Sequence, residues 1–229
     1  TVGKETIVSP VRHYLEDLET RLKWSPGTYS AKLPRLFQDY FGTIENADIP
    51  SSDPKYLSAI GSKFMISAVA RALLPGCKVD TMLVLEGGQG TGKGMFYRLL
   101  KRIWPYTMLQ VHDVDDVIGR FTGALERSYG VWMDEALFTH DRKSMERLKA
   151  AISEKEMRIE EKFEPKRTIK SHHRFFAATN NDHFGNIDTD DRRFFVQRVS
   201  SKHQQDHEYF SSYMSALEGD EEVPALVHT

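Results

Sequence analysis

The sequence contains a glycine-rich stretch with the composition of a phosphate-binding loop. Residues 85–94 read LEGGQGTGKG, in which Gly87, Gly92 and Lys93 fit the spacing G-x-x-x-x-G-K-[ST]. Backbone N–H groups of such a loop and of the following helix point their positive ends at phosphate oxygens, and the lysine reaches the β- and γ-phosphates. A glycine-rich turn with a solvated lysine is the alternative. The predicted phosphate contacts are Gly87, Gly88, Gln89, Gly90, Thr91, Gly92, Lys93 and Gly94.

Position 94 departs from this spacing. Glycine stands where a serine or threonine hydroxyl usually helps to hold Mg²⁺. Thr91 is one substitute ligand, and Asp134 acting with water is another; the sequence does not separate them. We expect the missing hydroxyl to raise the Mg²⁺ requirement of the site.

Two adjacent carboxylates follow an apolar segment further along the chain. Residues 129–135 read YGVWMDE, which predicts a buried strand that ends at Asp134 and Glu135. Asp134 would hold Mg²⁺, and Glu135 would act as the general base that polarises the attacking water. A surface pair that caps the next element is the alternative, but the position at a strand end, 41 residues after Lys93, favours catalysis.

Two later motifs supply an amide and two guanidinium groups. The stretch FFAATNN predicts Asn180 at the C-terminal end of a strand, where ligands of open α/β sheets bind and an amide can orient water. The stretch DDRRFFV offers Arg192 or Arg193 as an arginine finger for the γ-phosphate of a neighbouring subunit. The sequence does not rank the two arginines. An Asn-Asn turn and arginines paired with nearby aspartates are the structural alternatives.

Strands and helices must alternate if these motifs are to meet. Apolar runs predict buried strands at residues 82–85, 129–133, 174–179 and 193–199. Helical spacing predicts a helix over residues 93–103 and another that carries Met145, Leu148 and Ile152. Alternation of this kind predicts an α/β fold of the P-loop type, with a mostly parallel sheet.

The chain divides into three predicted parts. A cap signal at Asp53-Pro54 begins a helix that runs to Leu73, with Leu57, Ile60, Phe64 and Ala68 facing inward. Residues 1–76 are predicted to form an N-terminal helical subdomain, residues 77–200 the ATPase domain, and residues 201–229 an acidic helical segment or tail.

The composition of the chain excludes several classes of protein. The 229 residues carry a net charge of −2, which argues against a uniformly basic nucleic-acid binder. Positive charge is concentrated in residues 142–174, which hold 11 Lys and Arg against 6 Asp and Glu. A single cysteine, Cys77, excludes an internal disulfide and suits the cytoplasm, of a host cell if the chain is phage-encoded. Apolar runs are too short to span a membrane. Because Thr1 is not an initiator methionine, we expect either a segment of a longer protein or a processed product.

The four motifs together resemble a known family. LEGGQGTGKG, YGVWMDE, FFAATNN and DRRFFV look like the Walker A, Walker B, motif C and arginine-finger elements of superfamily 3 helicases. Within that group the chain is most similar to phage and plasmid primase-helicases, including the virulence-associated E type and poxvirus relatives. The resemblance covers residues 50 to 200.

This resemblance implies an AAA+ ATPase that forms rings, with hexamers expected, and moves on single-stranded DNA using ATP and Mg²⁺. Such members often follow a primase or polymerase domain, and 3′-to-5′ movement is expected from the family alone. A replication initiator or switch ATPase that binds DNA without robust unwinding is the main alternative. A small-molecule kinase is a third class, which would not need Asn180 or an arginine in trans.

Residues 157–173, MRIEEKFEPKRTIKSHH, predict a β-hairpin with a basic tip. In superfamily 3 helicases, a hairpin before motif C carries Lys or His into the central pore. The resemblance therefore makes Lys166 and Arg167 the first candidates for phosphate contact, followed by Lys162, Lys170 and His172. Phe163 could stack on a base or pack in the core. An exposed, solvated hairpin is the alternative.

Overall fold

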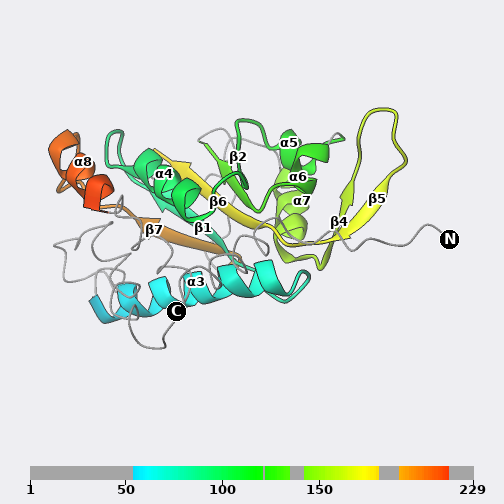
Figure 1. Ribbon diagram of the computed structural model, residues 1–229, viewed down its shortest axis with the longest axis horizontal. Coiled ribbons are helices and arrows are strands. Elements are labelled where there is room, and N and C mark those ends of the chain that lie inside the picture. Colours follow the sequence, from blue (N-terminus) through cyan, green and yellow to red (C-terminus); the bar gives the residue numbers. More distant parts are fainter. Residues whose placement is uncertain (1–53, 121, 135–141, 181–190, 217–229) are drawn as a thin grey trace.

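The computed structural model describes residues 54–120, 122–134, 142–180 and 191–216, and Figure 1 shows their arrangement. The helices are α3 (Pro54–Leu73), α4 (Lys93–Ile103), α5 (Asp115–Ile118), α6 (Gly123–Glu126), α7 (Arg142–Ser153) and α8 (His207–Ala216). The strands are β1 (Met82–Glu86), β2 (Met108–Val111), β3 (Gly130–Met133), β4 (Glu156–Ile159), β5 (Arg167–Lys170), β6 (Arg174–Thr179) and β7 (Phe194–Arg198).

Five strands form one sheet in the order β2-β3-β6-β1-β7, and each neighbouring pair is parallel. Every residue of β1, β3 and β6 is buried, because helices cover both faces of a parallel sheet. This explains the unbroken apolar runs of these strands. The predicted α/β fold with a mostly parallel sheet is confirmed.

Side chains alternate between the two faces of the sheet and build two apolar clusters. On one face, Leu85, Trp132 and Phe176 pack in a cluster with α3 and α4. On the other face, Val84 and Val131 pack in a cluster with α5, α6, α7 and β4. The sheet is therefore held between helices, and the loops at its C-terminal edge are left to form a site.

The predicted helix from Pro54 to Leu73 is confirmed as α3, with Leu57, Phe64 and Ala68 buried. These side chains belong to the same cluster as the sheet. Residues 1–53 lie outside the described part of the chain, so the division after residue 76 stays a prediction. No helix in the described ranges has the length and apolarity that a membrane span requires.

Candidate nucleotide-binding site

An open cavity of about 1030 Å³ lies at the C-terminal edge of the sheet. Its lining includes Gly90 and Gly92 of the glycine loop, Lys93 at the start of α4, Asp134 after β3 and Asn180 after β6. The C-terminal ends of parallel strands meet at one edge, so residues remote in sequence come together here. The volume is ample for a nucleotide-sized ligand.

The glycine loop has the backbone shape that its sequence demands. Gly90 and Gly92 adopt φ angles of +81° and +97°, which residues with a side chain rarely adopt. A Cβ atom at Gly92 would lie 2.4 Å from the ring of Phe210. No side chain caps the first turn of α4, which leaves the helix N-terminus suited to an anion.

Lys93 is held inside the loop and is only 8% exposed. Its amine donates hydrogen bonds to the carbonyl oxygens of Gly87 at 2.6 Å and Gly88 at 2.7 Å, and to Oδ1 of Asn180 at 2.6 Å. An ammonium group has three donors, so contact with a phosphate must replace at least one of these acceptors. The lysine thus lies at the cavity, where a bound phosphate would take the place of one of these partners.

Asp134 is half-buried at the end of β3 and faces the same cavity. Its Oδ2 accepts a hydrogen bond from Nε2 of Gln110 at 2.8 Å. Burial, with a smaller contribution from the Asp134 charge, raises the pKa of Tyr97 in the cavity wall. Glu135, the predicted general base, lies outside the described residues.

Two residues of the glycine loop, Thr91 and Gly94, bear on the predicted Mg²⁺ site. The hydroxyl of Thr91 is buried and donates to the carbonyl of Gly88 at 2.9 Å, so this side chain is engaged within the loop. Gly94 lines the cavity, and a Cβ there would meet no atom within 4 Å. Among the described residues no cluster of three metal-ligating side chains exists. One carboxylate with phosphates and waters is the ligand set that Mg²⁺ accepts.

The segment after β7 covers the glycine loop, which the sequence did not indicate. Nε2 of Gln204 donates to the carbonyl of Gln89 at 2.7 Å, and the backbone N–H of Gln205 donates to the carbonyl of Gly90 at 2.8 Å. Phe210 of α8 packs against the loop and lines the cavity. These contacts join positions more than 110 residues apart, and no local motif marks them.

The two candidate finger arginines lie at the opposite edge of the sheet. Both precede β7, whose first residue, Phe194, pairs with Met82 at the start of β1. Arg193 donates to both carboxylate oxygens of Asp191 at 3.2–3.3 Å and to Ser153 at 3.0 Å. Arg192 is exposed and makes no hydrogen bond or ion pair within the described part of the chain. Neither arginine lines the cavity of its own chain, so a role for either one at a ligand in such a cavity would require another subunit.

Comparison with known proteins identifies the family of this chain. A model of the virulence-associated protein E-like domain matches residues 18–219, which is most of the chain. The chain belongs to this family. The narrower assignment to superfamily 3 helicases stays a prediction.

Solved structures similar to this virulence-associated protein E-like domain support its fold. An apo structure of the NrS-1 C-terminal region, residues 305–718, matches with a TM-score of 0.63 and 20% identity over 90% of this chain and 50% of that one. A second apo form matches with a TM-score of 0.60 and 19% identity, over 89% of this chain and 48% of that one. The chain thus spans about half the length of these structures. The search of curated proteins found no match.

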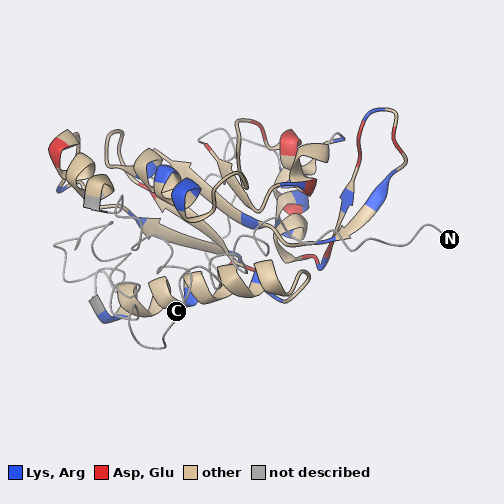
Figure 2. Cartoon of the chain, in the orientation of Figure 1, with Lys and Arg blue, Asp and Glu red and all other residues tan. Residues whose placement is uncertain are grey.

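The predicted hairpin of this domain is confirmed, since β4 and β5 pair antiparallel. The tip between these strands, residues 160–166, contains two cationic and three acidic side chains, so it is not basic as predicted. Figure 2 shows both signs of charge along the hairpin. Lys166 pairs with Glu160 at 2.7 Å, and Arg167 pairs with Glu126, Glu161 and Glu164.

The other predicted DNA contacts differ in accessibility. Lys162 and Lys170 are exposed. His172 is buried, and its Nε2 bonds the carbonyl of Ser128 at 3.1 Å, so its ring is not presented to a ligand. His173 stacks on it and bonds the carbonyl of Leu125 at 2.7 Å. Both histidines support the structure between the hairpin and β6.

Proposed function

We propose that this virulence-associated protein E-like domain is an ATP- and Mg²⁺-dependent motor that moves along single-stranded DNA during phage or mobile-element replication. Identical subunits, six by the resemblance, would form a ring behind a linked primase or polymerase domain. The observation that supports this most directly is the shared cavity of Lys93, Asp134 and Asn180. An amine, a carboxylate and an amide at one strand edge are the groups that phosphoryl transfer needs.

The cavity residues fit a nucleoside triphosphate with Mg²⁺. Loop amides and the uncapped start of α4 favour phosphate oxygens, and Lys93 adds a positive charge. When bound, ATP supplies the transferable phosphoryl group and Mg²⁺ neutralises part of its charge. Asp134 would hold the ion. Asn180 would orient the attacking water, and Glu135 would accept its proton.

Hydrolysis in this proposal requires a second subunit. Arg192 is exposed at the far edge of the sheet, remote from the cavity of its own chain. A neighbour placed edge to edge would bring that guanidinium to the γ-phosphate, where it stabilises developing charge. Arg193 is held by Asp191 and Ser153, so Arg192 is the preferred finger.

The test is the ATPase rate per chain, measured over a range of protein concentrations with and without a dT oligonucleotide. A site completed in trans gives a rate per chain that rises steeply with concentration, and a DNA motor is stimulated further by the oligonucleotide. Lys93→Ala is the control that exposes contaminating ATPases. A rate per chain that is constant with concentration and indifferent to DNA would refute the proposal and favour a kinase. DNA-stimulated ATPase without strand displacement would favour the initiator or switch.

A further inference from the structure

The tip of the β4–β5 hairpin presents an isolated aromatic ring. The hairpin projects from the body of the domain (Figure 1), and the side chain of Phe163 at its tip is 94% exposed. Its φ angle of +69° lies in the left-handed region, which is uncommon for a residue with a large side chain. The ring therefore lies outside the core, at a turn with an uncommon backbone conformation.

The cationic side chains around this ring differ in whether a carboxylate already pairs with them. Lys166 is paired with Glu160, and Arg167 is paired with Glu161 and Glu164 beside it. Lys162 has no carboxylate partner among the described residues, and its amine lies 5.2 Å from the centre of the Phe163 ring. At the tip, Lys162 and Phe163 are thus the accessible cation and ring, while Lys166 and Arg167 are each paired with carboxylates.

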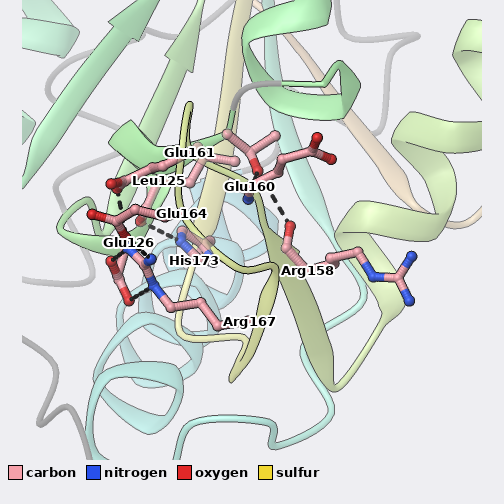
Figure 3. Close-up of polar contacts among 9 residues, drawn as sticks. Leu125, Glu126, Arg158, Glu160, Glu161, Glu164, Arg167 and His173 are labelled. Carbon is pink, nitrogen blue, oxygen red and sulfur yellow. Dashed lines mark hydrogen bonds and ion pairs between the residues drawn. The ribbon is translucent and has the colours of Figure 1, made fainter.

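Arg167 and the backbone of Glu160 join the hairpin to the body of the domain. Arg167 donates from Nε to Oε1 of Glu126 in α6 at 2.8 Å, as Figure 3 shows. The backbone of Glu160 bonds Thr122 twice: its carbonyl accepts from the N–H at 3.0 Å, and its N–H donates to Oγ1 at 3.2 Å. These contacts cross between separate elements, so the tip is positioned before any ligand arrives.

We infer that Phe163 is a stacking platform for an unpaired base of single-stranded nucleic acid, with Lys162 contacting the adjacent phosphate. Lys166 and Arg167 are positioning residues. The inference rests on the proposed function for the choice of a DNA strand. Every base offers a π-face, so this contact needs no particular sequence. A protein partner would require a broader apolar patch, whereas the neighbours Glu161, Lys162 and Glu164 are charged.

The test measures the affinity of the whole chain for two probes of equal length, a dT oligonucleotide and an abasic oligomer with the same phosphates. Phe163→Leu keeps an apolar side chain but removes the π-face. Phe163→Trp provides a larger π-face. We expect Phe163→Leu to weaken dT binding roughly 5- to 150-fold, the equivalent of about 1–3 kcal/mol per stacked base. Phe163→Trp should retain affinity, and the abasic oligomer should bind all three proteins alike.

Salt titrations separate the two lysines. Lys162→Gln should lower the slope of log K against log salt by about 0.7, the value for one phosphate contact on a single strand. Lys166→Gln should leave this slope unchanged, because its amine already has a carboxylate partner. The opposite pattern, with the slope lost in Lys166→Gln alone, would overturn the assignment of Lys162.

The outcomes also distinguish this inference from the proposed function. If the native chain binds dT and Phe163→Leu binds it equally well, the stacking role is wrong and the motor proposal stands. If Phe163→Leu changes the oligomeric state and not the affinity for DNA, the ring is a protein contact and the inference is again wrong. If the native chain binds neither probe, both proposals fail.

Discussion

The amine of Lys93 donates a hydrogen bond to Oδ1 of Asn180 at 2.6 Å, although 87 residues separate the two along the chain. The contact links the first turn of α4 to the end of β6. It also directs the amide NH₂ group of Asn180 away from the lysine, because Oδ1 is the atom that Lys93 engages. A donor is thereby left at the cavity wall, where an attacking water would have to be oriented.

Replacing Asn180 should affect turnover more than nucleotide affinity. Asn180→Ala removes a group that acts on the reacting water, so we expect kcat to fall about 100-fold while nucleotide affinity changes little. Asn180→Asp places a carboxylate beside the Lys93 amine and should hold that amine away from phosphate, which weakens nucleotide binding. ATPase kinetics and titration with a fluorescent ATP analogue measure both quantities. Equal losses of affinity in the two variants would contradict these separate roles.

A hydroxyl at position 94 should lower the Mg²⁺ requirement. The position lies in the cavity wall, and a new Cβ there meets no atom within 4 Å, so Gly94→Ser fits without rearrangement. We expect the Mg²⁺ concentration at half-maximal ATPase rate to fall, because Ser can supply the ligand that Gly94 lacks. Gly94→Ala is the matched control, since both variants remove a flexible glycine from the helix. Identical Mg²⁺ curves for Ser and Ala would exclude a metal-binding role for the hydroxyl.

Local patterns in the sequence are sufficient to predict one part of this site, the residues at the ends of the strands. Strands such as β1 and β6 are continuous apolar runs, which reveal burial on both faces. Once these strands are parallel, their C-terminal residues must share an edge, and Asp134 and Asn180 follow directly. Spacing along the chain was therefore sufficient to bring together the residues of the cavity.

Other parts of the fold and of the site leave no recognisable pattern in the local sequence. Strand β2 is short, lies at the sheet edge and is only partly buried, so its sequence pattern is weak and does not indicate Gln110. The contact between Gln204 and Gln89 joins two segments that share no motif. In the hairpin, Lys166 and Arg167 predicted a basic tip, but Lys166 pairs with Glu160 and Arg167 bonds Glu126, 41 residues away. Which acid neutralises which base is decided by tertiary structure.

Alanine substitutions of the two arginines before β7 should have different effects on ATPase rate and on stability. Arg192→Ala removes an exposed side chain, so we expect stability to be unchanged and the concentration-dependent part of the ATPase rate to be lost. Arg193→Ala removes bonds to Asp191 and Ser153 and should cost about 1 kcal/mol, a fall in Tm of roughly 2–4 °C. Thermal unfolding and ATPase assays on both variants test this. Loss of the concentration-dependent ATPase in Arg193→Ala, together with its retention in Arg192→Ala, would instead assign the finger to Arg193.

The lowered pKa of the buried His173 predicts that the protein loses stability in mild acid. Burial, with a smaller contribution from His172, lowers the pKa of His173 from 6.5 to about 3. Its Nε2 must carry the proton, because it bonds the carbonyl of Leu125. The folded state therefore keeps a neutral ring at pH values where the unfolded chain binds a proton. Stability is fully present above pH 6.5 and is lost progressively as the pH falls toward 3.

His173→Gln is the variant that isolates this effect. Glutamine can keep an Nε2 donor near the carbonyl of Leu125 but does not titrate. We expect the unfolding free energy of the native chain to fall between pH 6.5 and pH 5 more steeply than that of the variant, with slopes that differ by about 1 kcal/mol per pH unit. Urea unfolding at several pH values provides both slopes, and this range limits interference from carboxylates. Parallel pH profiles would mean that the folded protein accepts the proton at His173.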